Sequence, residues 1–357
     1  MKNNFIKINR RKIGNDYPPY IIAELSANHN GDINRAFKIL EMAKECGADA
    51  IKIQTYTQDT LTIDCDKADF KIKGGLWDSR TLYDLYTEAH MPWEWHKPLF
   101  DKAASLGITI FSTPFDKTAV DLLEELGAPA YKIASFEAID IPLIEYVAKT
   151  GKPMIISTGM ADEEEIKEAV DAAQNAGCNQ LIILHCVSGY PAPSYDYNLA
   201  TIRDMRKRFD VLTGLSDHTI DNTTAIASVA LGACLIEKHI TLDRKGGGPD
   251  DSFSLEKMEL FQLCRDSEIA WQALGKINYE RKESEKGNMV FRRSLYAVKN
   301  IAAGEILTRE NIRSIRPGYG LKPKHLKDVI GLVATADIDY GTALTKAVLS
   351  TLKKPNT

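Results

Sequence analysis

The fold is decided by residues 20–55, which read YIIAELSANHNGDINRAFKILEMAKECGADAIKIQT. The stretch begins and ends with short apolar runs, Tyr20–Ser26 and Ala50–Thr55, whose length and composition are typical of buried strands. Between them, apolar residues recur at the three-to-four spacing of an amphipathic helix, and Gly47 stands where that helix ends. These residues predict one strand–helix–strand unit of a parallel sheet.

The same pattern occurs eight times in series. Each apolar run closes with Glu, Lys, Ser, Thr, Asn or His, and an amphipathic segment follows it. Eight such units predict an α/β fold, the (β/α)8 TIM barrel, whose active sites lie at the carboxyl ends of the strands. The polar residues stand at those ends, so one pattern predicts both the fold and the position of the site. The runs are Tyr20–Ser26, Ala50–Thr55, Thr109–Phe115, Ala130–Ser135, Pro153–Gly159, Leu181–Ser188, Val211–His218 and Leu235–Thr241.

The composition, with 44% hydrophobic and 26% charged residues, is that of an ordinary soluble globular protein. The 357 residues exceed one barrel of roughly 250, so a small additional domain is expected. The net charge of −4 gives no reason to expect nucleic acid or a membrane as a partner, and no apolar run approaches the roughly 20 residues of a membrane span. The N-terminus lacks the apolar core of a secretory signal, and the six cysteines lack CxxC spacing. We therefore expect reduced thiols and a cytoplasmic location.

Two segments depart from the barrel repeat. An insertion from Tyr56 to His90 is rich in Trp, Tyr, Asp and Lys, and an insertion of this length on the catalytic face is expected to cover or shape the site. After the eighth helix, KINYERKESEKGN is charged and has no hydrophobic periodicity, which is typical of a linker. Short strand-like pieces separated by Gly and charged turns follow. We expect a barrel over 1–275, a linker over 276–290 and a small β-rich domain over 291–357.

Two histidines end adjacent strands of the predicted barrel. His218 closes the seventh run in GLSDH, and His239 follows Lys238 in EKH of the eighth. Adjacent strands would place the imidazoles side by side, a geometry suited to a divalent cation with open positions for water and substrate. Asp217 and Glu237 flank the pair as further ligands or as their hydrogen-bond partners. The alternative is that the histidines only form hydrogen bonds at the barrel mouth.

Two lysines interrupt apolar strands, where a buried ammonium group is costly unless it is paired. They are Lys52 in AIKIQT and Lys132 in YKIAS. In one alternative each pairs with a core carboxylate such as Glu24 or Glu137; in another, one lysine is the nucleophile of a Schiff-base aldolase, against which the histidine pair argues. With hydroxyls at neighbouring strand ends, the lysines predict a ring of donors for a phosphate dianion and a carboxylate. The hydroxyls are those of Thr113, Ser135, Ser157 and Ser216.

The ends of the first and eighth strands carry further polar candidates. Glu24 is an inward carboxylate within a strand, where burial is costly without a partner. Asn28 and His29 either face the site or cap the helix that begins near Asp32. The segment GGGPDD, Gly246–Asp251, is either a loop over the substrate or a plain flexible turn.

The chain resembles the sialic acid synthase family in seven segments, which are AELSANHNGD, ADAIKIQTYT, FSTPFD, YKIASFE, ISTGM, GLSDHT and IEKH in this order. Members condense phosphoenolpyruvate with an amino-sugar aldehyde to a nine-carbon 2-keto acid, which makes the chain a carbon–carbon bond-forming transferase if the resemblance holds. SLYAVKNIAAGEILTRENIRSIRPGYG resembles the antifreeze-like (SAF) domain of that family. Within the family, FKIKGGLWDSRTLYDLYTEAHMPWEWH most resembles the pseudaminic acid synthases.

The resemblance implies a role for each candidate. His218 and His239 correspond to the ligands of a divalent ion, Mn²⁺, Mg²⁺ or Co²⁺. The catalytic set comprises Glu24, Lys52, Lys132, Glu137 and Glu237. The residues that correspond to the phosphoenolpyruvate site are Lys52, Thr113, Lys132, Ser135, Ser157 and Ser216. Those that correspond to the sugar site are Glu137, Ser188, Tyr190, Asp250 and Arg316, the last reaching the barrel of a second subunit in a domain-swapped homodimer.

One departure bears on the sugar. Sialic-type enzymes have Asn in the loop before YP, where this chain has Ser188 in HCVSGYP. With the insertion around Trp77, this departure favours 2,4-diacetamido-2,4,6-trideoxy-L-altrose over N-acetylmannosamine, and therefore pseudaminic acid synthesis. The alternatives are an N-acetylneuraminate or legionaminate synthase that uses a manno-configured amino sugar. A binding or structural protein, with the terminal module as its working part, is a competing class that the polar barrel mouth disfavours.

Overall fold

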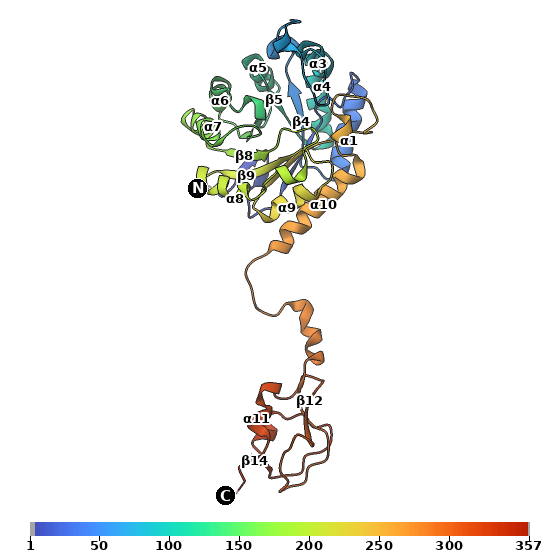
Figure 1. The fold of residues 1–357 in the computed structure, drawn as a ribbon, viewed down its shortest axis with the longest axis vertical. Coiled ribbons are helices and arrows are strands. Elements are labelled where there is room, and N and C mark those ends of the chain that lie inside the picture. Colours follow the sequence, from blue (N-terminus) through green and yellow to red (C-terminus); the bar gives the residue numbers. More distant parts are fainter. Residues whose placement is uncertain (1–3, 356–357) are drawn as a thin grey trace. The chain divides into compact units, whose positions relative to one another are not determined.

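The computed structural model describes residues 4–355 and divides the chain into two compact units, Met1–Gly275 and Lys276–Thr357. The first unit is a closed parallel barrel with strand order β10-β3-β4-β5-β6-β7-β8-β9. Helices surround these strands in Figure 1. The predicted TIM barrel is confirmed, and each predicted run contains one barrel strand. The strands are β3 (Tyr20–Glu24), β4 (Ala50–Thr55), β5 (Thr109–Pro114), β6 (Tyr131–Ile133), β7 (Met154–Ser157), β8 (Leu181–Cys186), β9 (Leu212–Asp217) and β10 (Leu235–His239).

The outer helices begin and end at residues suited to capping. The side chains of Asp32, Asp116 and Asp162 accept hydrogen bonds from backbone N–H groups at the starts of α1, α5 and α7. Gly47 and Gly107 adopt the left-handed conformation at the ends of α1 and α4. The helices are α1 (Ile33–Cys46), α4 (Trp93–Leu106), α5 (Lys117–Glu125), α6 (Ile141–Ala148), α7 (Glu163–Asn175), α8 (Thr201–Phe209), α9 (Thr223–Ala230) and α10 (Lys257–Leu274), with 3-10 turns η2 (Ser135–Glu137), η3 (Ser194–Asp196) and η4 (Asp251–Phe253).

Two additions close the barrel unit. The hairpin β1 (Ile6–Ile8) and β2 (Arg11–Ile13) buries its isoleucines against the inner side chains at the amino ends of the strands, so it covers that end of the barrel. The insertion after β4 contains α2 (Gln58–Leu61), the 3-10 turn η1 (Ala68–Phe70) and α3 (Leu82–Ala89). Because the hairpin covers the amino end of the barrel, the cavity that the polar side chains line lies at the opposite, carboxyl end.

The inner face of each strand changes from apolar to polar along its length. In β3, Tyr20 and Ile22 belong to the inner apolar cluster, and Glu24 two residues later lines the cavity at the carboxyl end. In β10, Leu235 is likewise apolar, and Glu237 and His239 line the cavity. Side chains two residues apart in a strand share a face. The apolar layer thus supports the polar layer directly.

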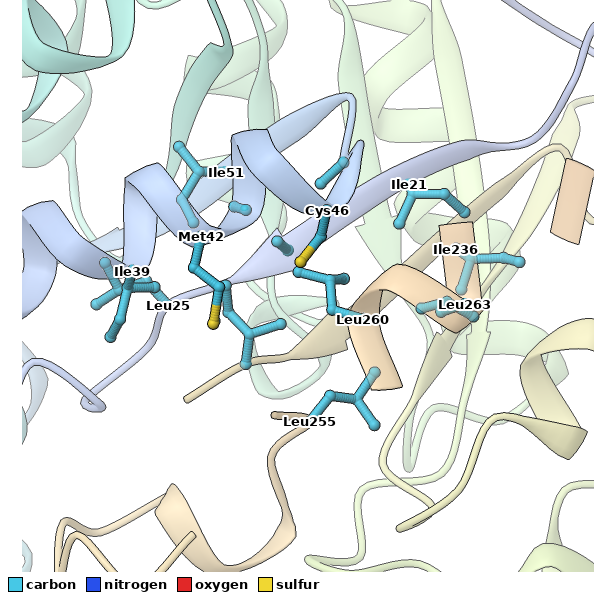
Figure 2. Close-up of a cluster of buried hydrophobic side chains, with 14 of the residues drawn as sticks. Ile21, Leu25, Ile39, Met42, Cys46, Ile51, Ile236, Leu255, Leu260 and Leu263 are labelled. Atoms are coloured by element: carbon cyan, nitrogen blue, oxygen red, sulfur yellow. The ribbon is translucent and has the colours of Figure 1, made fainter. Parts of the chain in front are cut away.

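The outer faces of the strands pack against the helices. Figure 2 shows Ile21 of β3, Ile236 of β10, Met42 of α1 and Leu260 and Leu263 of α10 in one cluster. These side chains are almost fully buried. Within residues 4–355, no helix has the length and hydropathy needed to cross a membrane.

The second unit is small and rich in short strands. Leu295, Leu307 and Leu344 are fully buried at the centre of its own apolar cluster. Its strands are β11 (Ser294–Ala297), β12 (Ile312–Ile315), β13 (Val333–Ala334) and β14 (Leu352–Lys353), and its helical segments are η5 (Glu283–Phe291), η6 (Pro323–His325), α11 (Leu326–Val329) and α12 (Lys346–Leu349).

Candidate active site

A cavity of about 390 Å³ lies at the carboxyl ends of the barrel strands, a volume suited to small-molecule ligands. It brings together most of the site residues predicted from the sequence. Thr113 lies directly beside it, because its Oγ1 accepts a hydrogen bond of 3.0 Å from Lys52 Nζ. Arg316 belongs to the other unit, where its side chain is exposed. The predicted residues that line the cavity are Glu24, Lys52, Lys132, Ser135, Glu137, Ser157, Tyr190, Ser216, His218, Glu237, His239 and Asp250.

The two lysines face the cavity from the barrel interior, but they are paired differently. Lys52 Nζ lies 2.8 Å from Glu24 Oε2 and 3.6 Å from Glu237 Oε1. Lys132 Nζ lies 3.8 Å from Glu237 Oε1 and donates to the Ile133 carbonyl at 3.1 Å. One alternative from the sequence was that each lysine pairs with a core carboxylate. This holds for Lys52 and Glu24, although both groups also line the cavity. The carboxylate near Lys132 is Glu237.

This pairing shifts the pKa values of the lysines in opposite directions. Burial lowers the pKa of Lys132 below its ordinary value, and Glu237 only partly opposes the effect. Burial acts on Lys52 in the same direction, but the charges of Glu237 and Glu24 outweigh it and hold the pKa of Lys52 above its ordinary value. Lys52 thus contacts two carboxylates, at 2.8 and 3.6 Å, whereas Lys132 contacts one, at 3.8 Å.

The two buried glutamates also differ. Burial raises the pKa of Glu24, and Lys52 opposes this shift. Burial would raise the pKa of Glu237 as well, but Lys132 and Lys52 together hold that pKa below its ordinary value. The environment therefore makes Glu24 the weaker acid of the two and Glu237 the stronger.

The imidazole rings of His218 and His239 lie with their centroids 5.4 Å apart. His218 Nδ1 donates a hydrogen bond of 2.8 Å to the Val187 carbonyl, because a carbonyl oxygen can only accept. The lone pair of Nε2 is therefore the one that can bind a metal ion. Among the residues described, no group of three or more His, Cys, Asp or Glu side chains is arranged to hold an ion. The histidine pair nevertheless fits a divalent cation whose other ligands are water or substrate oxygens.

Several buried polar atoms at the cavity have no hydrogen-bond partner among the residues described. They are Glu137 Oε2, Ser157 Oγ, Glu237 Oε2 and His239 Nδ1. A buried polar atom without a partner costs about 1–3 kcal/mol, and native proteins rarely leave several together. Their convergence indicates a polar ligand, and the histidine nitrogen among them fits a metal.

Tyr190 and Asp250 lie beside the histidines and also line the cavity. The Tyr190 ring is centred 4.4 Å from that of His218. Asp250 accepts a short hydrogen bond from Ser26 and lies 3.9 Å from His239 Nδ1. Burial raises the pKa of Glu137, on the same cavity, to about 7.

The loop after β7 approaches Ser188 closely. A Cβ at Gly159 would lie 2.2 Å from Ser188 Oγ and 2.8 Å from Ser135 Oγ. The Gly159 N–H donates to Ser135 Oγ at 3.1 Å. Glycine therefore allows the hydroxyls at these two loops to converge.

The insertion lines the cavity with apolar side chains. Trp77 packs against Tyr190, with ring centroids 5.8 Å apart, and its Nε1 donates to the Pro249 carbonyl at 3.1 Å. This contact fastens the insertion to the loop after β10. The apolar lining residues of the insertion are Tyr56, Leu61, Ile72, Trp77, Leu82, Leu85, Tyr86 and Ala89.

The glycine-rich loop Gly246–Asp251 is held in place by polar contacts. Asp251 accepts hydrogen bonds from Arg35, Asn30 and the Gly248 N–H at 2.8–3.0 Å. Gly248 packs so tightly that an added Cβ would lie 1.9 Å from Asn30 Oδ1. These contacts anchor the loop, which includes Asp250 on the wall of the cavity.

Some residues of the site were not singled out from the sequence. Gln54 lines the cavity and donates to Glu24 Oε1 at 3.0 Å and to Ser26 Oγ at 3.1 Å. Its place two residues after Lys52 in β4 is the signal that could have identified it. Asn28 and His29 do not cap α1, because Asp32 does. Instead Asn28 donates to the Ile240 carbonyl and to Ser254 Oγ, both at 2.8 Å.

The closed barrel, with its polar cavity at the carboxyl ends, defines a TIM-barrel enzyme. The NeuB family profile matches residues 39–279, and the SAF domain profile matches residues 292–350. The chain belongs to the NeuB family, and the predicted resemblance to sialic acid synthases is confirmed.

Three known proteins illustrate this relationship. The pseudaminic acid synthase of Campylobacter jejuni subsp. jejuni serotype O:23/36 (strain 81-176) is 46% identical over 93% of this chain and 98% of its own length. The pseudaminic acid synthase of Helicobacter pylori (strain ATCC 700392 / 26695) is 41% identical over 92% and 96%. The crystal structure of N-acetylneuraminic acid (sialic acid) synthetase from Leptospira borgpetersenii serovar Hardjo-bovis in complex with citrate is 32% identical, with a TM-score of 0.71, and the match covers 80% of this chain and 94% of that one.

Proposed function

We propose that the chain is a pseudaminic acid synthase, which condenses phosphoenolpyruvate with 2,4-diacetamido-2,4,6-trideoxy-L-altrose to a nine-carbon 2-keto sugar acid. The observation that carries this proposal is the convergence of two buried lysines, two histidines and unpartnered polar atoms on one cavity. The similarity to pseudaminic acid synthases over nearly the whole chain supports the choice of sugar.

Phosphoenolpyruvate occupies the deeper part of the cavity in this proposal. Among the residues described, Lys132 has only the 3.8 Å contact with the carboxylate of Glu237, so an incoming phosphate or carboxylate would give it a closer anionic partner. Lys52 contributes a second charge that stays fixed by Glu24. The hydroxyls that complete the site are those of Thr113, Ser135, Ser157 and Ser216.

His218 and His239 would hold a divalent ion, Mn²⁺, Mg²⁺ or Co²⁺, which supplies Lewis-acid polarisation of the sugar aldehyde when bound. C3 of phosphoenolpyruvate attacks the aldehyde carbon, and the positive charge that develops at C2 lies near the carboxylates of Glu24 and Glu237. Water then adds at C2, and phosphate leaves by C–O cleavage. The lysines position the substrate and stabilise charge without forming a covalent intermediate.

The sugar would lie toward Tyr190, Asp250 and Glu137, under the apolar side chains of the insertion. A trideoxy sugar with two acetamido groups carries three methyl groups, and an apolar wall such as Trp77 gives these a favourable contact. N-acetylmannosamine has one acetamido methyl and more hydroxyls, which the same wall would desolvate without partners.

The proposal extends to the assembly and its location. We infer a domain-swapped homodimer in which Arg316 completes the site of a second subunit, because a planar guanidinium suits the oxygens of a sugar. A cytoplasmic location is supported by the six cysteines, all of which are free thiols.

The test is phosphate release from phosphoenolpyruvate with three sugars: the L-altrose derivative, N-acetylmannosamine and the manno-configured sugar of the legionaminate branch. We expect the highest kcat/KM with the L-altrose derivative. A higher value with a manno-configured sugar would move the chain to the sialic or legionaminic branch. Chelation should abolish activity and Mn²⁺ should restore it, and full activity of a His218→Ala, His239→Ala double variant would contradict the metal site.

A further inference from the structure

Lys238 is a buried charge that lies outside the cavity. In β10, Glu237 and His239 face the barrel interior, so Lys238 between them faces the helices. Its side chain is only 2% exposed. An ammonium group buried in this layer requires compensation by close acceptors.

The compensation comes from the turn that follows β9. Lys238 Nζ donates to Asp217 Oδ2 at 2.9 Å, to the Thr219 carbonyl at 2.7 Å and to the Asp221 carbonyl at 2.8 Å. An ammonium group has three protons, and all three are used. Asp217 also accepts from the Thr219 N–H through its other oxygen at 2.9 Å. One ammonium and one carboxylate together fix the backbone of residues 217–221.

This arrangement connects the two predicted metal ligands. His218 lies between Asp217 and Thr219, both of which Lys238 contacts, and His239 is the next residue after Lys238. Asp217 and Lys238 are direct neighbours in the pairing of β9 with β10. The contacts therefore join the strand that carries one imidazole to the turn that carries the other.

We propose that Lys238 is a positioning residue that sets the relative placement of His218 and His239 and thereby the affinity of the site for a divalent ion. This inference rests on the proposed function, because it takes the histidine pair to be the ion site. Among the residues described, the other hydrogen bonds of His218 are those of its Nδ1 with the Val187 carbonyl and Cys186 Sγ, of its N–H to Tyr197 Oη at 2.7 Å, and of the Ala192 N–H to its carbonyl at 3.0 Å. None of these connects His218 to β10, whereas the contacts of Lys238 do.

The experiment measures binding of Mn²⁺ alone to the full chain, by electron paramagnetic resonance of the free ion. In Lys238→Met, which keeps the volume of the stem, we expect the Kd for Mn²⁺ to rise about 10-fold, the lower end of the effect of losing a direct partner of a metal ligand, because Lys238 acts on His218 through residues 217 and 219. At saturating Mn²⁺ the KM for phosphoenolpyruvate should not change, because Lys52 and Lys132 are intact. Leu143→Ala, a buried residue of α6 in a different cluster, is the control for lost stability, and it should bind Mn²⁺ normally.

A double variant, Lys238→Met with Asp217→Leu, separates the loss of positioning from the loss of charge compensation. It also replaces the single variant in the binding measurement if that variant does not fold. Removing both charges should restore folding stability. Mn²⁺ affinity should remain low, because the carbonyls of Thr219 and Asp221 still lack their donor. Normal Mn²⁺ affinity in either variant would overturn the role of Lys238 and leave the proposed function intact. If the unaltered chain bound no Mn²⁺, or bound it equally well without both histidines, the ion site itself would be wrong and this inference with it.

Discussion

At the residue scale, the two lysines of the cavity differ in what they contribute to stability. Replacing Lys52 with Met would leave Glu24 without its cation at 2.8 Å and Glu237 with Lys132 alone at 3.8 Å, and breaking such a buried pair costs about 3–5 kcal/mol. Replacing Lys132 with Met removes one contact with a carboxylate, that of Glu237 at 3.8 Å, which Lys52 also contacts at 3.6 Å, so the free energy of unfolding should fall by less than in the Lys52 variant. Both variants should lose phosphate release. Urea unfolding without substrate measures the difference.

The two variants control for each other, since each exchanges a buried lysine for the same residue in the same cavity. Equal destabilisation would show that Lys132 is paired within the protein as strongly as Lys52 is. Its assignment as the open partner for an anionic substrate would then be wrong.

Glu137 should make the stability depend on pH. Burial raises its pKa to about 7 in the folded chain, whereas an unfolded glutamate titrates near 4.5. Between these values the folded state holds a proton that the unfolded state has lost, so the stabilising contribution is complete below pH 4.5 and disappears as the pH rises to 7.

The comparison of Glu137→Gln with the unaltered chain isolates this effect. The variant should gain about 1–3 kcal/mol relative to the unaltered chain as the pH rises from 4.5 to 7.5. Denaturant unfolding at several pH values without substrate is the measurement. Parallel pH profiles for the two proteins would contradict the raised pKa.

Individual site residues were predictable where the strand pattern determines the direction of the side chain. The alternation along β10 places Glu237 and His239 inward, and both were identified from the sequence. Asp217 was expected beside the histidines as a ligand or partner, yet the same alternation turns it outward to Lys238. Pairing between buried charges depends on which strands are neighbours, so the sequence around Lys238 did not predict its contact with Asp217.

At the element scale, the insertion after β4 determines one side of the cavity. Trp77→Ala would remove both the contact with Tyr190 and the hydrogen bond to the Pro249 carbonyl. We expect the KM for the sugar to rise about 10-fold or more, as for loss of a large apolar contact, and the KM for phosphoenolpyruvate to remain unchanged. Initial rates with each substrate varied in turn measure the two values.

Leu76→Ala is the matched control, because Leu76 is the adjacent residue, is 48% exposed and does not line the cavity. It should leave both KM values unchanged. If Trp77→Ala behaved like this control, the insertion would have no part in sugar binding.

Most elements could be predicted because their signals are local. The barrel strands combine apolar runs with polar ends, and the structure places every one of them within its predicted run. The hairpin of β1 and β2 escaped prediction, since its strands have three residues each and carry Lys7 and Lys12 on the outer face. Its three isoleucines are buried only against the end of the folded barrel, so the local sequence does not identify them as core residues.

At the scale of the whole molecule, the proposed exchange of terminal units predicts complementation between inactive chains. An Arg316→Ala chain and a His218→Ala chain should each be inactive alone. After subunit exchange, each heterodimer contains one intact barrel facing an intact Arg316, so random mixing should restore about a quarter of the unaltered activity.

Mass spectrometry of tagged subunits verifies that exchange has taken place, and phosphate release measures the recovery. Verified heterodimers without activity would mean that Arg316 acts within its own chain or has no part in the reaction. The sequence suggested this arrangement through the family resemblance and through a charged linker without an apolar face, but a linker pattern does not determine which barrel a domain approaches.

The contact between Gly248 and Asn30 has a consequence for the evolution of this chain. With 1.9 Å between Asn30 Oδ1 and a Cβ at position 248, no descendant can accept a side chain there while the asparagine keeps its present position. Asn30 in turn is held by Asp251, and Asp251 by Arg35 on α1. These four positions should therefore vary together across lineages, with a smaller residue at 30 preceding any loss of the glycine. Amino-acid substitutions in this part of the barrel mouth would therefore have to occur in a fixed order.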